Sequence, residues 1–349
     1  MAEHRPRVWV SQPLFDEVIE QLAADVDVVS APHVTAHSSA AIAAALAQVD
    51  GALVTLNERI GAAEIANAPR LRAVANVGVG YNNLDLAALS AAGIVATNTP
   101  DVLTETTADL GFALLMAAAR RVGESERWLR AGQWQQWSFT TMLGADIHGS
   151  TLGILGMGRI GQAIARRGAH GFGMEVIYHN RSPLPASVEQ PLGARYVGFE
   201  PLLAHADHLV LVLPYSPQSH HIIDAAALAQ MKPTATLVNI ARGGLVDELA
   251  LADALAKGRL AAAGLDVFEG EPQVRAELLA LPNVVLTPHI GSASAATRRA
   301  MVALAVDNLR AALGLGADAG RPRNALNANA VATARAATGI TTIKTGIKR

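Results

Sequence analysis

Short apolar segments alternate with Ala-rich segments of helical length along most of the chain. The apolar segments are rich in β-branched residues, which is typical of buried parallel strands joined by helices. A first series of predicted strands comprises Val8–Val10, Val26–Val29, Ala52–Thr55, Ala73–Asn76 and Ile94–Thr97. A second series comprises Thr151–Leu155, Glu175–Tyr178, His208–Leu213, Thr236–Ile240, Ala263–Val267 and Val284–Thr287. Two such series predict an α/β protein with two doubly wound parallel sheets.

Two longer helical segments mark where the chain passes between the predicted domains. Residues 101–121 lie between the two series of strands, and Ser292–Leu313 follows the last strand. This placement predicts a discontinuous first domain that the chain leaves and later rejoins. From Gly320 onward the sequence turns polar and loses its periodicity, which is typical of a mobile or surface-draped tail. The predicted divisions are residues 1–99 plus 291–330, residues 100–290, and a tail of residues 331–349.

Composition excludes several classes of protein. The 349 residues suffice for about two domains of roughly 150 residues each. Hydrophobic residues make up 51% and aromatic residues only 4%, so the cores must consist mainly of Ala, Val, Leu and Ile. The 28 basic and 30 acidic residues leave no basic excess for a nucleic-acid partner. The absence of Cys excludes disulfides, Cys-based zinc sites and thiol nucleophiles.

The sequence also predicts a cytoplasmic protein without a membrane partner. Met1–Val10 contains no apolar stretch of signal-peptide length. The most apolar helical run, Gly111–Ala119, is far shorter than the roughly 20 residues that cross a bilayer.

A G-x-G-x-x-G turn follows the predicted strand Thr151–Leu155 and precedes a helical segment. Gly156 permits the tight turn, Gly158 lets the backbone approach a pyrophosphate, and Gly161 brings helix and strand together. The N-terminus of the helix offers unpaired N–H groups and a partial positive charge to phosphates. Because both the strand and the helix are predicted around it, the turn indicates a dinucleotide site.

The end of the next strand indicates which dinucleotide binds. An NAD site usually has an acidic residue there that accepts from the ribose 2′-hydroxyl. Here the strand begins with Glu175 and is followed by Asn180, Arg181 and Ser182, so no carboxylate is in place. An Arg can pair with a 2′-phosphate through two parallel hydrogen bonds. NADP(H) is therefore favoured, with NAD(H) as the weaker alternative.

Three polar residues follow three late strands, where ligands bind in open α/β sheets. Arg242, Glu271 and His289 together match the needs of 2-oxo-acid reduction. Arg can hold the substrate carboxylate and polarise the adjacent carbonyl. His can give a proton to the forming alkoxide, and a neighbouring carboxylate would orient the ring and favour the imidazolium. Glu269 is an alternative to Glu271 for this last role.

No metal site is predicted. His205 and His208 lie three residues apart, and His220 and His221 are adjacent, but no further ligand joins either pair in a recognisable spacing. Both pairs are expected at surface or helix-end positions.

Four linked motifs resemble the D-isomer-specific 2-hydroxy-acid dehydrogenase family: Gly156–Gly161, Asn239–Asp247, Gly264–Pro272 and Thr287–Ser292. The likeness extends from about Gly51 to Arg323. It implies a flavodoxin-like substrate domain and a Rossmann nucleotide domain with a cleft between them. It also implies that Arg242, Glu271 and His289 bind substrate and relay the proton, with Asp266 as the carboxylate on the nicotinamide side.

The resemblance implies further contacts. The loop Asn76–Gly80 resembles the family's substrate loop, in which the N–H groups of Val79 and Gly80 would hold the substrate carboxylate. Ser292 is expected beside the substrate. Contacts to the cofactor are expected from Thr107, Arg159, Ile160, Pro214 and Ile240.

Within the family, Thr99–Thr107 and Trp134-x-x-Trp137 resemble the glyoxylate/hydroxypyruvate reductase branch. The branch implies a homodimer formed through the nucleotide domain, in which Trp137 either reaches the partner's active site or anchors an extended loop.

The sequence therefore predicts NADPH-dependent reduction of small 2-oxo acids to D-2-hydroxy acids. Glyoxylate and hydroxypyruvate are the leading substrates, and 2-ketogluconate is a further candidate. One alternative is a dehydrogenase of the same family that acts on a phosphorylated acid such as 3-phosphoglycerate, although Tyr81, Asn82 and Asn83 supply no basic group beside the substrate loop. The other alternative is a non-catalytic dinucleotide-sensing protein.

Overall fold

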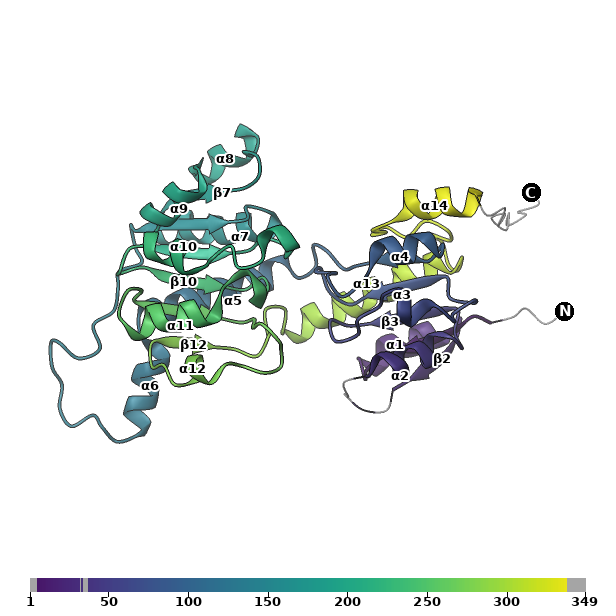
Figure 1. Cartoon of the computed structure of the whole chain (residues 1–349), viewed down its shortest axis with the longest axis horizontal. Coiled ribbons are helices and arrows are strands. Elements are labelled where there is room, and N and C mark those ends of the chain that lie inside the picture. The colour runs from purple at the N-terminus through teal and green to yellow at the C-terminus, as the bar shows by residue number, and fades with distance from the viewer. Residues whose placement is uncertain (1–4, 32, 34–36, 338–349) are drawn as a thin grey trace. The chain divides into compact units, whose positions relative to one another are not determined.

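The structure is a computed structural model that describes residues 5–31, 33 and 37–337 (Figure 1). It consists of two compact units. Unit 1 comprises Met1–Leu103 and Ser294–Arg349, and unit 2 comprises Thr104–Ala293. The predicted divisions, after residues 99 and 290, fall a few residues before these bounds.

Unit 1 contains a five-stranded sheet in the order β2-β1-β3-β4-β5, and every neighbouring pair is parallel. This is the flavodoxin-like strand order, as predicted. The strands are β1 Arg7–Val10, β2 Asp27–Ser30, β3 Gly51–Val54, β4 Ala73–Asn76 and β5 Val95–Thr97. The helices are α1 Asp16–Ala23, α2 Ser39–Leu46, α3 Ala62–Ile65, α4 Leu86–Ala91, α13 Ala295–Ala312 and α14 Ala328–Ala337.

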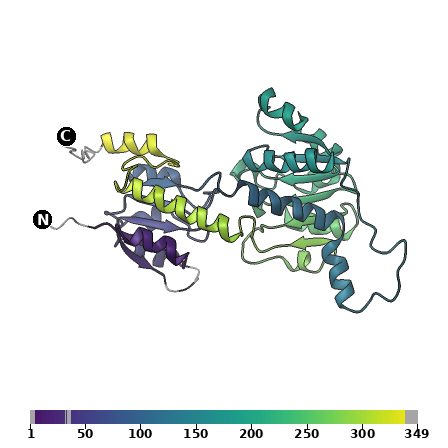
Figure 2. The ribbon, with the colours of Figure 1, turned by 180° about the vertical axis from the view of Figure 1, so that it is seen from behind.

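Apolar side chains cover both faces of this sheet. On one face, Ile42 of α2 and Leu89 of α4 pack against strand residues such as Val54. On the other face, α1 and α13 supply Leu22 and Val306. Figure 2 shows α13 lying along this second face. Burial on both faces explains why the strands read as short continuous apolar runs.

Unit 2 contains a seven-stranded sheet in the order β12-β11-β10-β9-β6-β7-β8, again parallel throughout. The order reverses between β6 and β9, as it does in a Rossmann domain. The strands are β6 Thr151–Leu155, β7 Glu175–His179, β8 Ala194–Tyr196, β9 His208–Leu211, β10 Thr236–Asn239, β11 Ala262–Leu265 and β12 Val284–Leu286. The fold class predicted from the sequence is confirmed.

The helices of unit 2 cover the two faces of its sheet. Leu209 and Leu211 face the core that α9, α10 and α11 close, whereas Val210 between them faces the core of α5 and α7. The helices are α5 Thr104–Ala119, α6 Val122–Arg130, α7 Arg159–Arg166, α8 Ala186–Leu192, α9 Phe199–His205, α10 Ala225–Gln230, α11 Glu248–Ala256 and α12 Ala276–Leu279. Shorter turns are the π-helical Arg167–Gly171 and the 3-10 segments Pro217–Ser219 and Gly243–Leu245.

The first residues of the predicted tail form a helix that lies against unit 1. Helix α14 runs through the predicted start of the tail, and Val331 within it is buried. The side chain of Asn327 anchors this helix to unit 1: its Oδ1 accepts from Ala96 N at 2.9 Å, and its Nδ2 donates to Ile94 O at 3.0 Å. These long-range bonds leave no periodic signal in the sequence. Residues 338–349 of the predicted tail lie outside the described residues.

Two other details differ from the predictions. The edge strand β8 was not predicted, because Ala194, Arg195 and Tyr196 include a charged, exposed residue and form no apolar run. His208 is fully buried at the start of β9 rather than at the surface or a helix end. No helix among the described residues combines the length and apolarity needed to cross a membrane.

Candidate active site

The glycine-rich turn joins β6 to α7 at the point where the strand order reverses. Gly156 has a φ of +103°, and a Cβ there would lie 2.7 Å from Leu213 N. A Cβ on Gly161 would lie 2.4 Å from Gly156 O, whereas one on Gly158 would meet nothing within 4 Å. No side chain caps the N-terminus of α7. The turn therefore has no room for a side chain at Gly156 or Gly161, whereas the space in front of Gly158 is open. A pyrophosphate site requires both features.

The loop that follows β7 is fixed at both of its ends. At its start, Asn180 Oδ1 accepts from Met157 N of the glycine-rich turn at 2.7 Å. At its end, Leu184 N donates to Tyr178 Oη at 2.6 Å, and Tyr178 donates to Glu189 at 2.5 Å. Burial and the Glu189 carboxylate raise the pKa of Tyr178 to about 12, so the phenol remains a donor.

Arg181 and Ser182 lie in this fixed loop. Both side chains are exposed, and neither has a hydrogen bond or ion pair within the described residues. The amide oxygen of Asn180 binds the turn, which leaves its amide nitrogen as a donor for a ligand, and its predicted cofactor contact stays a prediction. The anchors Tyr178 and Glu189 were missed, since a Tyr in a strand and a Glu in a helix are unremarkable in a sequence.

Arg242, Glu271 and His289 follow β10, β11 and β12, which are neighbours in the sheet. Because parallel strands end at the same edge, these residues are brought to one edge of unit 2. His289 Nδ1 lies 2.7 Å from Glu271 Oε2. His289 has a φ of +52°, an uncommon conformation for a non-glycine residue and one that clusters at functional sites.

The electrostatics of Glu271 suit a residue that stays ionised beside His289. Burial raises the pKa of Glu271, but the hydrogen bond and charge of His289, the Phe268 N–H at 2.9 Å and the Arg242 charge outweigh it. The net pKa lies below the ordinary 4.5. The carboxylate is therefore charged across the neutral range.

Arg242 is half-buried, and its backbone is held by the strand end. Asn239 Nδ2 donates to Arg242 O at 2.8 Å, while Asn239 Oδ1 accepts from Ala241 N at 3.0 Å. Burial lowers the pKa of Arg242, and the Glu271 charge opposes that shift. Asn239 was not predicted as a site residue, although an Asn closing a strand is a turn signal.

Asp266 organises the loop that carries His289. Its Oδ1 accepts from Thr287 Oγ1 at 2.6 Å and from Ile290 N at 2.8 Å, and its Oδ2 accepts from Gly291 N at 2.8 Å. Burial raises the pKa of this carboxyl despite those bonds. Three of the roughly four acceptor positions of this carboxylate are therefore used within the protein, and the residue is 1% exposed.

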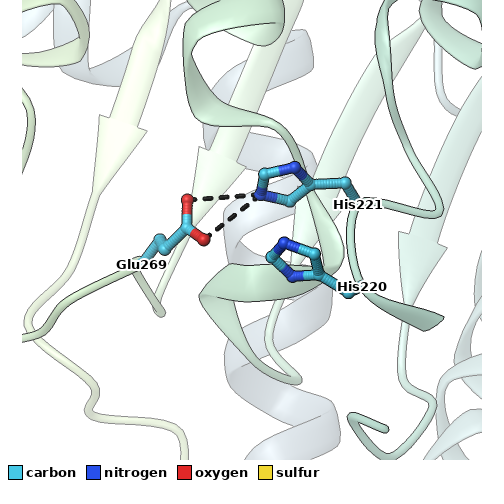
Figure 3. A group of neighbouring side chains, drawn as sticks. All are labelled: His220, His221 and Glu269. Atoms are coloured by element: carbon cyan, nitrogen blue, oxygen red, sulfur yellow. Dashed lines mark hydrogen bonds and ion pairs between the residues drawn. The ribbon is translucent and has the colours of Figure 1, made fainter. Parts of the chain in front are cut away.

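Glu269, the alternative partner for His289, points to a different group. It lies 3.2 Å from His221 Nε2 and 3.6 Å from Arg275 Nη2. Figure 3 shows Glu269 beside the two adjacent histidines, an association that their sequence spacing did not predict. In the structure, therefore, Glu271 and not Glu269 is the carboxylate that contacts His289.

The substrate loop predicted in unit 1 has its carbonyls turned inward. Asn98 Nδ2 donates to Val79 O at 2.8 Å, and Asn76 Nδ2 donates to Gly80 O at 2.9 Å. The backbone N–H groups of Val79 and Gly80 make no hydrogen bond within the described residues. These two adjacent N–H groups are therefore available as hydrogen-bond donors.

The remaining predicted residues are placed as follows. Thr107 of α5 packs beside the His289 loop, since a Cβ on Gly291 would lie 3.4 Å from its Cγ2. The side chain of Ile240 is buried in the core, so only its backbone can meet a cofactor. Trp137 is 67% exposed and packs on Phe139 with ring centroids 4.5 Å apart. Arg159 and Pro214 are exposed, and Ile160 and Ser292 are partly buried.

Comparisons with known proteins agree with this geometry. Residues 112–291 match the D-isomer specific 2-hydroxyacid dehydrogenase, NAD binding domain. A glyoxylate reductase of Thermococcus onnurineus is 49% identical over 75% of this chain and 79% of its own. A glyoxylate/hydroxypyruvate reductase B of Klebsiella pneumoniae is 43% identical over 88% of this chain and 95% of its own.

A solved structure is similar over nearly the whole chain. It is the NADPH-dependent glyoxylate/hydroxypyruvate reductase of Sinorhizobium meliloti in complex with NADP and malonate. It shares 37% identity, covers 93% of this chain and 98% of its own, and gives a TM-score of 0.81. With this fold, this turn and these relatives, the chain belongs to the D-isomer specific 2-hydroxyacid dehydrogenase family.

Proposed function

We propose that the protein reduces small 2-oxo acids, glyoxylate and hydroxypyruvate first among them, to D-2-hydroxy acids, using NADPH. The observation that carries the proposal is the 2.7 Å contact between His289 and Glu271 at the sheet edge that also bears Arg242 and the glycine-rich turn. Relatives named glyoxylate reductase and glyoxylate/hydroxypyruvate reductase support the substrate class.

A bound nicotinamide dinucleotide would supply the hydride. The open front of the turn at Gly158 and the uncapped N-terminus of α7 would hold its pyrophosphate. The residues present fit such a group, because the tight inner side of the turn admits no side chain at Gly156 or Gly161.

His289 serves as the proton donor in this proposal. Its Nδ1 is bound to Glu271, which leaves Nε2 to donate a proton to the forming alkoxide oxygen. The ionised Glu271 stabilises the protonated ring before transfer. Arg242 holds the substrate carboxylate and polarises the carbonyl. The free N–H groups of Val79 and Gly80 suit the same carboxylate chemistry.

Arg181 underlies the proposed preference for NADPH. Its exposed guanidinium has no partner within the described part of the chain and sits in a loop whose ends are fixed. The Sinorhizobium meliloti relative is described as NADPH-dependent. Arg181→Asp should lower the NADPH-to-NADH ratio of kcat/KM by at least roughly tenfold, since it replaces an attraction for the 2′-phosphate by a repulsion.

The control for that variant is Arg120→Asp, which changes another exposed arginine of unit 2. An unchanged cofactor ratio in Arg181→Asp, or an equal loss in Arg120→Asp, would remove Arg181 from the site.

The decisive experiment is a panel of 2-oxo acids assayed with both cofactors. The panel includes glyoxylate, hydroxypyruvate, 2-ketogluconate and 3-phosphohydroxypyruvate. His289→Ala should lower kcat/KM on the best substrate by about 10²- to 10⁴-fold while NADPH binding, measured by fluorescence titration, stays unchanged. NADPH binding without turnover of any acid would favour a dinucleotide-sensing protein. A preference for the phosphorylated acid would assign the protein to another branch of the 2-hydroxyacid dehydrogenase family.

We also propose a homodimer formed through unit 2. The segment that follows α6 exposes Trp134, Trp137, Phe139 and Leu143, each more than half exposed. Exposed aromatic clusters of this kind mark interaction surfaces.

A further inference from the structure

Three side chains of unit 2 converge beside the proposed active site without a part in its chemistry. His220, His221 and Glu269 each offer a ligand atom, and these atoms lie within 4.8 Å of one another (Figure 3). The two histidines follow the 3-10 turn Pro217–Ser219, and Glu269 follows β11. Only the folded chain brings them together.

The backbone holds the two imidazoles side by side. His221 has a φ of +49°, and its N–H donates to Gly244 O at 2.9 Å. The two rings are stacked, with centroids 3.8 Å apart and an interplanar angle of 25°, so the exposed His220 ring must rotate for both Nε2 atoms to point at one ion. Tyr215 Oη lies 3.2 Å from His220 Nδ1, which leaves Nε2 of His220 for another ligand. A hydrogen bond to the second ring nitrogen is the usual support of a metal-binding histidine.

We propose that His220, His221 and Glu269 bind a divalent transition-metal ion, for which Zn²⁺ is the best match. Two imidazole nitrogens and one carboxylate oxygen are a ligand set that Zn²⁺ takes with a fourth, open position. His221 Nε2 and Glu269 Oε1 are 3.2 Å apart. Two ligand atoms about 2.05 Å from a tetrahedral ion are separated by about 3.3 Å, so this pair is already at the required spacing. The exposure of His220 leaves room for a water at the open position.

A neighbouring cation, Arg275, acts against the ion. Its Nη2 lies 3.6 Å from Glu269 Oε2, which also lies 3.3 Å from His221 Nε2. However, Arg275 Nε lies 3.3 Å from Oε2 of the buried Glu248. The positive charge of Arg275 is thus divided between the carboxylates of Glu248 and Glu269. Glu269 Oε1 therefore keeps enough negative character to serve as a ligand.

Three segments that support the proposed active site meet at this cluster, and the ion would join the first and the third of them. Tyr215–His221 follows β9, and Arg242–Gly244 follows β10. The third segment, Phe268–Glu271, is so tightly packed against the second that a Cβ on Gly243 would lie 1.9 Å from Phe268 C. A metal bound to both His221 and Glu269 would therefore fix the segment that carries Glu271. We expect it to stabilise unit 2 against thermal unfolding.

The test is direct binding of Zn²⁺ and Co²⁺ to the untagged protein after removal of metals by a chelator. Isothermal titration should give one site per chain, and bound Co²⁺ should show the strong visible absorption of a tetrahedral site. His221→Ala, Glu269→Gln and His220→Ala should each weaken binding by at least tenfold. Zn²⁺ should raise the melting temperature of the wild-type protein and leave that of His221→Ala unchanged.

His170→Ala is the matched control, because His170 is an exposed histidine of unit 2 outside the cluster. Its metal affinity should equal that of the wild type. His220→Ala removes an exposed ring, so circular dichroism should show an intact fold. Lack of binding by the wild type, or equal affinity in all variants, would overturn the proposal. Because the readout is metal binding, the result is independent of the proposed reductase activity.

Discussion

At the scale of single residues, the site depends on which carboxylate each histidine contacts. Glu269 and Glu271 are two positions apart, yet Glu271 binds His289 and Glu269 binds His221. Two hydrogen bonds fix the backbone around the two glutamates. Phe268 N donates to Glu271 Oε1, and Glu269 N donates to Glu248 Oε1 at 2.6 Å. The roles of the two glutamates thus follow from local hydrogen bonds.

Glu271→Gln should slow turnover. The pKa of Glu271 lies below its ordinary value, so the carboxylate stays charged at neutral pH, and it lies 2.7 Å from His289 Nδ1. Without that charge the proposed proton donor loses its ionised partner, and kcat/KM for reduction should fall by roughly 10- to 100-fold.

The measurement is kcat/KM at neutral pH with the best 2-oxo acid. Glu277→Gln, a change at an exposed glutamate of α12, is the control and should leave kcat/KM unchanged. The wild-type kcat/KM in Glu271→Gln would show that this carboxylate has no part in turnover.

At the scale of elements, two glycines of the turn that joins β6 to α7 have different structural roles. Gly161 allows α7 to approach the strand, whereas Gly158 keeps the space in front of the turn open. A substitution at either position adds one methyl group, but the two methyl groups meet different surroundings. They therefore allow stability and cofactor binding to be tested separately.

Gly161→Ala should destabilise unit 2 by about 1–3 kcal/mol, because its Cβ would press on the Gly156 carbonyl. Gly158→Ala should leave stability nearly unchanged, since its φ of −77° suits alanine and its Cβ meets no atom. It should nevertheless weaken dinucleotide binding, because the methyl group stands where the pyrophosphate would lie. Urea unfolding and fluorescence titration measure the two effects. Equal affinities for the dinucleotide in Gly158→Ala and the wild type would contradict the placement of the pyrophosphate.

Strand β9 contains a group that links stability to pH. Burial lowers the pKa of His208, and its Nδ1 has no hydrogen-bond partner within the described residues. The folded state therefore keeps the ring neutral below the ordinary pKa of 6.5, whereas the unfolded chain takes up a proton there. The stability contributed by this group is present above pH 6.5 and is lost as the pH falls below it.

Urea unfolding at pH 7.5 and pH 5.5 should show this loss, and His208→Gln should reduce it. His205→Gln, at the exposed end of α9, should retain the pH dependence of the wild type. The same dependence in all three proteins would assign the effect to other groups.

At the scale of the whole molecule, the exposed aromatic segment after α6 has no cover within the described chain. If Trp137 acts in the partner's active site, then Trp137→Ala and His289→Ala, each weakly active alone, should complement each other when mixed. Half of the dimers would be mixed and would hold one intact site, so the activity should recover to roughly a quarter of the wild type. Light scattering should show a dimer throughout. Absence of recovery after subunit exchange would place Trp137 in its own subunit's site or in the interface alone.

The sequence by itself determined the fold class, the strands of both sheets apart from β8, the glycine-rich turn and the three residues of the proposed reaction. It could do so because buried parallel strands leave unbroken apolar runs, and because their carboxyl ends must share one edge. Only the tertiary structure decided which carboxylate His289 contacts, that Glu269 joins His220 and His221, and that Asn327 anchors a terminal helix. These contacts join residues 18 to 233 positions apart, and side-chain direction within the packed fold selects them. Periodicity reports only whether a position is buried, and it carries no information on which distant group a side chain will meet.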